Sequence, residues 1–133
     1  MNVEPAEFVK FIEENHEKAK LVNDAKARTW SDEAEHALLR LANGKMALVR
    51  GGRDGIQFIV RGEGDRRTLQ LEIAGGEFQV DRILWHTHPQ VTGPSDGDLE
   101  ALAILKQDAS LIYEIGGSPD GTRITPKSKP RSD

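Results

Sequence analysis

The segment LWHTHPQVTGPSDGD, residues 84–98, holds three side chains that could bind a metal ion. His86 and His88 are two positions apart, so in a β-strand both imidazoles project from the same face. Asp98 follows a turn-rich loop and can return to the histidines from the first turn of a helix. Zn²⁺ accepts two imidazoles and a carboxylate, and a fourth position then remains for water, whose pKa falls to about 7. The spacing therefore predicts a hydrolytic zinc site.

Ser95 lies just before Asp98, where its hydroxyl could donate to the oxyanion formed when hydroxide attacks a carbonyl. These residues also have a simpler interpretation, because S-x-x-D before an apolar run is a common helix-capping pattern. A lone H-x-H pair is likewise frequent by chance. Packing alone does not readily explain a buried strand that ends in HTHP and is followed by SDGD, and capping is compatible with catalysis. We therefore expect a metal on His86, His88 and Asp98, with Ser95 beside it.

Three segments have the apolar spacing of helices. The pattern indicates helices over residues 5–27 and 31–43, and a third helix over 94–107 that carries Asp98 in its first turn. His16 and His36 fall on polar faces of the first two helices, where surface histidines without a special role are expected.

The rest of the chain alternates like β-strands. KMALVR and IQFIVR, separated by GGRDG, predict a hairpin over residues 45–61, and TLQLEI follows it. The motif strand FQVDRILWHTH is apolar on both sides before the histidines, which predicts a central strand with Trp85 in the core. SLIYEI and GTRIT are the last strands. This order predicts an α+β domain with a mixed or antiparallel sheet.

The composition limits the class of protein. A length of 133 residues matches one domain, and a net charge of −4 argues against a nucleic-acid partner, which would need a basic stripe. No apolar run approaches the ~20 residues of a membrane span, and the N-terminus lacks the apolar centre of a signal peptide. With no cysteine, a metal would have only nitrogen and oxygen ligands. We expect a protein that is cytoplasmic or exported without a cleavable signal peptide.

In its motif the chain resembles the JAMM metalloproteases, whose domain is of the JAB/MPN type. The family pattern is H-[ST]-H-P, about seven residues and then S-x-x-D; this chain has HTHP at 86–89 and SDGD at 95–98, with a loop one residue shorter. The resemblance implies a cytidine-deaminase-like JAB/MPN sandwich, a mixed β-sheet flanked by helices, over residues 31–126. Residues 1–30 would then be an N-terminal helical extension and 127–133 a disordered tail.

Carried onto these positions, the resemblance implies zinc held by His86, His88 and Asp98, with Ser95 assisting the oxyanion. The implied activity is hydrolysis of a peptide or isopeptide bond in a peptide, a protein or a ubiquitin-like conjugate. The motif strand is expected to accept the substrate as an added β-strand. Small family members also occur as C-terminal domains of bacterial toxin proteins, a context that this sequence fits.

The family also uses a glutamate as the general base for zinc-bound water, at the start of the strand after the first core helix. With a helix over residues 31–43, that strand begins at Lys45, and a protonated lysine cannot accept the proton. Two other glutamates are alternatives. Glu72, on a neighbouring strand, is preferred over Glu35, which would lie on the solvent side of a helix.

Two further functions remain open beside the zinc hydrolase. Lys45 at the base position favours a pseudoenzyme that binds metal, and a partner, without turnover. The third function is an interaction domain that binds no metal. A scaffold without use for a metal would have little reason to keep two histidines, a serine and an aspartate in register, and this favours the hydrolase.

Overall fold

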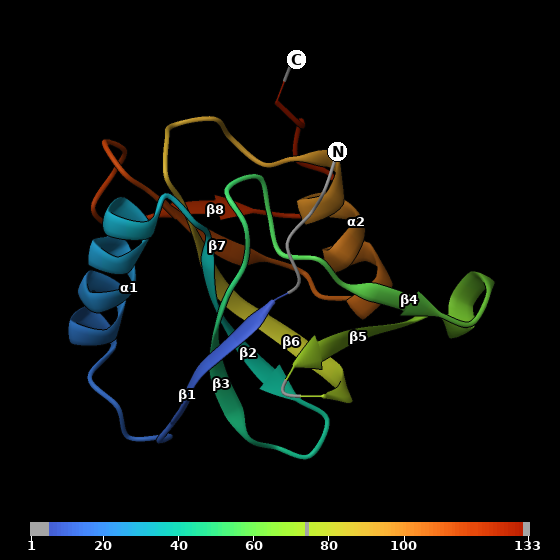
Figure 1. Ribbon diagram of the computed structural model, residues 1–133. Coiled ribbons are helices and arrows are strands. Elements are labelled where there is room, and N and C mark those ends of the chain that lie inside the picture. The colour runs from blue at the N-terminus through green and yellow to red at the C-terminus, as the bar shows by residue number, and fades with distance from the viewer. Residues whose placement is uncertain (1–5, 74, 132–133) are drawn as a thin grey trace.

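The computed structural model describes residues 6–73 and 75–131, which form an α+β fold with a mixed sheet flanked by two helices (Figure 1). The helices are α1 (Lys18–Asp32) and α2 (Asp96–Leu105), with a short 3-10 helix at Gly64–Arg66. The strands are β1 (Glu7–Ile12), β2 (His36–Leu41), β3 (Met46–Arg50), β4 (Ile59–Arg61), β5 (Thr68–Ile73), β6 (Gly76–His88), β7 (Ser110–Glu114) and β8 (Thr122–Ile124). Within the described ranges, no helix is long and apolar enough to cross a membrane.

The strand order is β1-β3-β2-β6-β5-β4, and β7 pairs with β6 and carries β8 on its other edge. All pairs are antiparallel except β6 with β7. Parallel neighbours need a crossover connection, which α2 provides between these two strands. The crossover brings the start of α2 back to the end of β6, so the sequence positions of HTHP and SDGD meet in space.

β6 is the longest strand and organises the sheet. One edge pairs with β2, and the other pairs first with β5 and then with β7. Gln107 fills the gap between β5 and β7: its side chain accepts from the Ile83 amide at 2.9 Å and donates to the Ile83 carbonyl at 2.6 Å. At Trp85 and His86 both edges of β6 are occupied, so the expected addition of a substrate strand to the motif strand is wrong there.

The predicted helices over residues 5–27 and 31–43 are each wrong in part. Glu7–Ile12 is the edge strand β1, and the helix α1 begins only at Lys18. α1 ends at Asp32, where Glu33 has a left-handed conformation, and His36–Leu41 is the central strand β2. HALLRL is apolar on both faces of the sheet, and a short run of that kind fits helical spacing as well as strand spacing.

The predicted hairpin over residues 45–61 is also wrong. β3 pairs with β1 and β2, whereas β4 pairs with β5. The hairpin partner of β3 is β2, and the tight turn between them is at Asn43-Gly44, where Gly44 has a φ of +89°. The chain from Gly51 to Phe58 is a loop between two separate strand pairs.

The two faces of the sheet have different cores. Leu38, Trp85 and Tyr113 pack with α1, and the ring of Trp85 meets Tyr113 edge-on at 5.9 Å between centroids. Leu39 and Val80, among others, face α2. The core position predicted for Trp85 is confirmed.

His36 is fully buried on β2, contrary to the surface position expected for it. Burial lowers its pKa, which a hydrogen bond to the Ala34 carbonyl only partly offsets. Its backbone amide donates to the hydroxyl of Thr87, which also contacts Thr29 of α1. These contacts tie the back of the motif strand to β2 and α1.

The N- and C-terminal segments also contribute to the fold. β1 pairs with β3 and α1 covers one sheet face, so residues 6–30 supply parts of the same sheet and core. At the other end, the Thr125 amide donates to the hydroxyl of Ser128 at 2.8 Å, and the Arg131 amide to the Pro94 carbonyl at 2.8 Å. Residues 127–131 of the predicted disordered tail are therefore placed against the fold, and the remaining two lie outside the described residues.

Candidate metal centre

Four side chains converge at the end of β6 on the face covered by α2. One ligand atom from each of Glu35, His86, His88 and Asp98 lies within 4.8 Å of the others. The Nε2 atoms of His86 and His88 are 3.0 Å apart, and Asp98 Oδ2 is 3.3 Å from each of them. Glu35 Oε2 lies farther out, 3.8 Å from His88 Nε2. A buried group of two imidazoles and two carboxylates of this kind could bind a metal ion.

The strand geometry of β6 aims both imidazoles at one point, as predicted. The two rings have centroids 4.8 Å apart and meet at 62°, and both side chains are buried. Thr87, between them, points to the opposite face, where its hydroxyl contacts β2 and α1. Two imidazole nitrogens only 3.0 Å apart need a proton or a cation between them, because their lone pairs repel.

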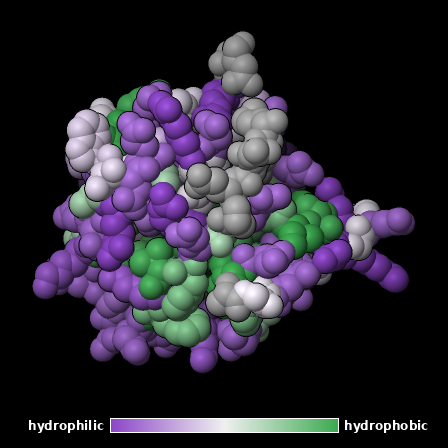
Figure 2. All heavy atoms as spheres, viewed as in Figure 1, coloured by the Kyte–Doolittle hydropathy of each residue, from purple (hydrophilic) through white to green (hydrophobic). Residues whose placement is uncertain are grey.

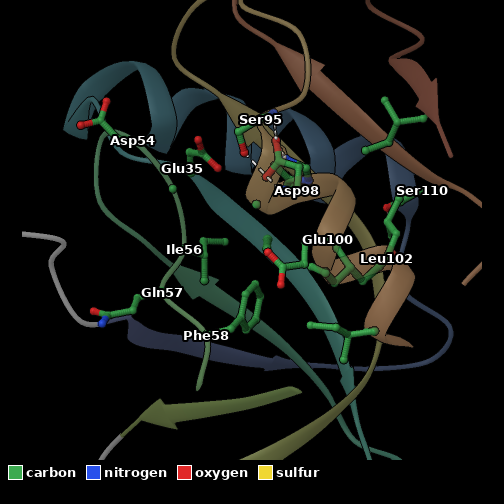
Figure 3. Close-up of a pocket in the computed structure, with 18 of the residues that line it drawn as sticks. Glu35, Asp54, Ile56, Gln57, Phe58, Ser95, Asp98, Glu100, Leu102 and Ser110 are labelled. Atoms are coloured by element: carbon green, nitrogen blue, oxygen red, sulfur yellow. Dashed lines mark hydrogen bonds and ion pairs between the residues drawn. The ribbon is translucent and has the colours of Figure 1, made fainter. Parts of the chain in front are cut away.

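Asp98 reaches the histidines from the first turn of α2. The Ser95 hydroxyl accepts from the Asp98 amide at 3.0 Å, and the Asp98 carboxylate accepts from the Ser95 amide at 2.9 Å. This is a complete capping box, so the capping interpretation is confirmed. The same carboxylate oxygen faces both imidazoles, and the Ser95 hydroxyl keeps its own proton free to donate. Figure 3 shows Ser95 and Asp98 side by side at one end of a cavity.

Glu35 enters the cluster from the residue before β2. Its amide donates to the Gly52 carbonyl at 2.9 Å and its carbonyl accepts from the Gly51 amide at 2.7 Å, so its backbone is held as in a strand. The side chain lines the cavity and is 4% exposed, not on the solvent side as expected.

The other two positions considered for a general base lie elsewhere. Lys45 is in the turn between β2 and β3, with its Nζ 5.0 Å from the centroid of the Phe11 ring. Glu72 is exposed and pairs across the β5–β6 ladder with Glu77, near the start of β6, whereas the histidines are at its end. The structure thus reverses the preference for Glu72 over Glu35.

The charges of the cluster shift the pKa of its members. Burial raises the pKa of Glu35 to about 7, although the charges of His86 and His88 oppose this. Burial would lower the pKa of His88, but the hydrogen bond to Asp98 and the charge of Glu35 outweigh it and raise the value to about 8. Burial likewise opposes ionisation of Asp98, yet its hydrogen bonds to the two histidines lower its pKa. Burial therefore makes the charged form of Glu35 costly in the metal-free cluster.

Glu114 is a part of the site that the sequence did not indicate. Its Oε2 accepts from His88 Nδ1, from the Thr92 amide and from the Gly93 amide, each at 2.9 Å. A carboxylate on Nδ1 fixes the tautomer whose Nε2 lone pair faces the cluster. The parallel register of β6 and β7 places Glu114 opposite His88, and the only local signal was an acidic residue at the end of the apolar strand SLIYE.

Arg131 is a second unforeseen neighbour of the cluster. Its guanidinium donates to the Thr92 hydroxyl at 3.1 Å, and Thr92 Oγ1 lies 3.3 Å from His88 Nδ1. The charge of Arg131 also lowers the pKa of Glu35, against the larger effect of burial. The C-terminal segment therefore supports the loop between His88 and Ser95.

A cavity of about 330 Å³ opens beside the cluster. Glu35, His86, Ser95 and Asp98 lie at one end, and mostly apolar side chains line the rest (Figure 3). A small molecule or a segment of a substrate could therefore reach the cluster from this side.

No protein-family model, curated protein or solved structure matches this chain. The feature that bears on function is a buried group of histidines and carboxylates, next to a cavity, that could bind a metal ion.

Proposed function

We propose that the chain is a zinc-dependent peptidase or isopeptidase of the JAMM type, with His86, His88 and Asp98 as ligands and Glu35 as general base. The observation that carries the proposal is the spacing of the four groups. Two ligands about 2.05 Å from a tetrahedral zinc ion are roughly 3.3 Å apart. The three spacings among His86, His88 and Asp98 are 3.0, 3.3 and 3.3 Å, whereas Glu35 is 3.8 Å from His88. His86, His88 and Asp98 thus have the spacing of zinc ligands, and Glu35 has the spacing of a group next to the ligands.

The choice of metal follows from the donor atoms. The sequence has no cysteine, and two imidazoles with one carboxylate are a ligand set of hydrolytic zinc enzymes. When bound, zinc would polarise the scissile carbonyl and lower the pKa of a coordinated water.

The protein groups around this position have complementary roles. The Glu35 carboxylate, beside the ligand position and lining the cavity, can take a proton from the attacking water and return it to the leaving amine. The Ser95 hydroxyl, at the N-terminus of α2, can donate to the oxygen that becomes negative. The amino end of α2 also favours negative charge there. Buried apolar walls in the cavity limit access of bulk water to these groups.

The order of elements supports the family assignment within the proposal. Glu35 directly precedes β2, the strand that follows the helix α1, and the start of that strand is where the JAMM family has its glutamate. The motif strand, α2 and β7 then follow in the family order. With this glutamate present, Lys45 no longer favours a pseudoenzyme. The substrate would be a peptide, a protein or a ubiquitin-like conjugate, and the bacterial toxin-domain context is part of the same proposal.

The test combines metal analysis with matched variants. Purified protein should bind one zinc per chain and cleave a member of a di-ubiquitin and peptide panel, with activity lost on chelation and restored by zinc. Glu35→Gln should retain zinc and lose about 10²- to 10⁴-fold in kcat, the usual contribution of a general base. Glu72→Gln, an exposed glutamate outside the cluster, is the control and should match the unmodified protein.

Two results would overturn the proposal in different ways. Absence of bound zinc after reconstitution would remove the metal centre. Zinc-loaded protein that cleaves nothing in the panel would leave a metal-binding module instead of an enzyme.

A further inference from the structure

The cavity beside the cluster has two chemically different ends. Its polar end holds Glu35, His86, Ser95 and Asp98, and the remainder extends between the loop Gly51–Phe58 and α2 (Figure 3). Among the residues that the structure describes, none that lines the cavity is a lysine or an arginine. A ligand that binds at the polar end can therefore extend directly into a mainly apolar space.

Apolar side chains from the loop and from α2, β2 and β6 line this space. Ile56 and Phe58 come from the loop and lie across from α2 in Figure 3, and Ala101 and Ile104 come from α2. Ala37 of β2 and Ile83 of β6 also line it. Ile56 and Phe58 are partly exposed, as expected of a wall with room in front of it.

The loop wall is held in place by the same backbone contacts that hold Glu35. Gly51 and Gly52 bond to the carbonyl and the amide of Glu35, and the Gly52 amide donates to the Gly55 carbonyl at 2.8 Å. A Cβ on Gly51 would lie 2.6 Å from both the Gly55 oxygen and the Ile56 side chain, so only glycine allows this close approach. The apolar wall and the proposed base are therefore positioned together.

The size of the cavity fits a side chain with a short stretch of main chain. At about 330 Å³, it is at the lower end of the range for small-ligand sites, roughly 300–1,000 Å³. A dry cavity of ~150 Å³ already holds a benzene-sized group. The space is therefore large enough for a leucine or phenylalanine side chain.

The charges of the lining select against acidic groups. Asp54 and Glu100 line the cavity beyond the cluster, and although Glu100 lies 3.6 Å from Arg67, Arg67 itself does not line it. A carboxylate placed among these groups would lose hydration and meet like charge.

We propose that this apolar space is a specificity pocket that takes one large aliphatic or aromatic side chain of the substrate, next to the bond that is cleaved. The inference rests on the proposed function, since the metal centre defines where that bond lies. It predicts a peptide substrate with a bulky apolar residue beside the scissile bond, in preference to glycine or an acidic residue. Ile56 and Phe58 are the specificity-determining residues.

Hydroxamates test the pocket without turnover, because the hydroxamate group binds zinc and is not cleaved. One series is N-acetyl-glycine, -leucine and -aspartate hydroxamate, which place the side chain on the acyl side of the metal. A second series, hydroxamates of malonyl-glycine, -leucine and -aspartate amides, places it on the amine side. Isothermal titration of the zinc-loaded protein should give, in one series, a leucine compound about 10- to 100-fold tighter than the glycine compound, the gain for burying such a side chain. The aspartate compound should bind no tighter than glycine.

Matched variants assign the selectivity to the pocket. Phe58→Ala should reduce the leucine-to-glycine ratio to less than a third of its original value. Phe78→Ala makes the same change at a partly exposed ring outside the cavity lining and should leave the ratio intact. Ile56→Ala provides a second pocket variant should Phe58→Ala not fold.

The outcomes separate this inference from the metal centre. If glycine and leucine compounds bind equally in both series, or if the ratio survives both pocket variants, the specificity pocket is refuted and the metal centre stands. If zinc-loaded protein binds no hydroxamate, the specificity pocket is likewise refuted; if the protein takes up no zinc, the metal centre itself is refuted and the inference falls with it.

Discussion

Glu114 provides a test of the metal centre that leaves its ligands untouched. A single oxygen of Glu114 accepts hydrogen bonds from His88 Nδ1 and from the amides of Thr92 and Gly93, all at 2.9 Å. Glu114→Gln keeps an acceptor of the same shape and removes its charge. Glu114→Ala removes the acceptor and leaves all three donors without this partner.

The expected loss follows from these contacts. A hydrogen bond to a charged acceptor contributes about 1.5–3 kcal/mol and one to a neutral acceptor about 0.5–1.5 kcal/mol, so the bond to His88 should weaken by about 1 kcal/mol in Glu114→Gln. That corresponds to roughly a 5- to 10-fold weaker zinc Kd. Glu114→Ala also frees the imidazole to rotate, and the loss should approach 100-fold, the upper range for removing a partner of a ligating histidine.

Competition with a chromophoric zinc chelator measures the zinc Kd of both Glu114 variants. Glu72→Gln is the control for loss of one glutamate charge. Urea unfolding of the metal-free variants should be run in parallel, because the Thr92 and Gly93 amides lose a buried partner in Glu114→Ala at a cost of about 1–3 kcal/mol each. Zinc affinity that is the same in Glu114→Gln, Glu114→Ala and the unmodified protein would show that His88 is not oriented by Glu114. It would refute the reasoning even if zinc binds.

Three further predictions concern the metal-free protein. Burial raises the pKa of Glu35 to about 7, and the hydrogen bond to Asp98 and the charge of Glu35 outweigh burial to raise the pKa of His88 to about 8. The stabilisation from Glu35 is therefore fully present below about pH 4.5 and lost as pH rises through 7, and that from His88 is present below about pH 6.5 and lost through pH 8. Urea unfolding with chelator should show a decline of roughly 4–5 kcal/mol from these two groups between pH 4.5 and 8, and a flat profile would contradict the burial of these groups. Ser95→Ala should cost about 1 kcal/mol of unfolding free energy through loss of the N-cap, with Ser118→Ala as an exposed control. Gln107→Ala should cost about 1–3 kcal/mol, because the Ile83 amide loses its buried partner, whereas the Ile83 carbonyl keeps the Ser110 hydroxyl at 2.8 Å; a loss below about 0.5 kcal/mol would show that water replaces the glutamine.

The part of the site that could be predicted from sequence is the part specified by local signals. Strand alternation placed His86 and His88 on one face, Pro89 marks the end of the strand, and the capping box placed Asp98 in the first turn of α2. Each of these signals involves residues within a few positions of one another. For that reason the motif strand and the helix after it were correctly predicted.

The parts that could not be predicted depend on contacts between distant residues. Glu114 meets His88 only because α2 crosses over and sets β7 parallel to β6 in one register. β1 has enough apolar residues to suggest a helix, but it is a strand because β3 offers it an edge, and a shift in register puts Phe8 and Phe11 on one face. In both cases tertiary pairing decides a question that local propensity leaves open.

The position of Glu35 shows how the choice between helix and strand affects the proposed chemistry. When residues 31–43 are taken as a helix, Glu35 lies on a solvated face, and the next strand begins with Lys45. As the strand β2, the same residues place Glu35 at the cluster and Lys45 in a turn. The burial of Glu35 that follows from this strand has a free-energy cost, and that cost points to a role for the residue. A carboxylate that is 4% exposed and has no lysine or arginine ion pair among the described contacts is expensive to ionise, as its raised pKa shows. Together with Asp98 and two imidazoles it forms a group whose charge protons or a metal cation can balance. Burial that would be unfavourable for a structural glutamate is therefore consistent with the base proposed for it.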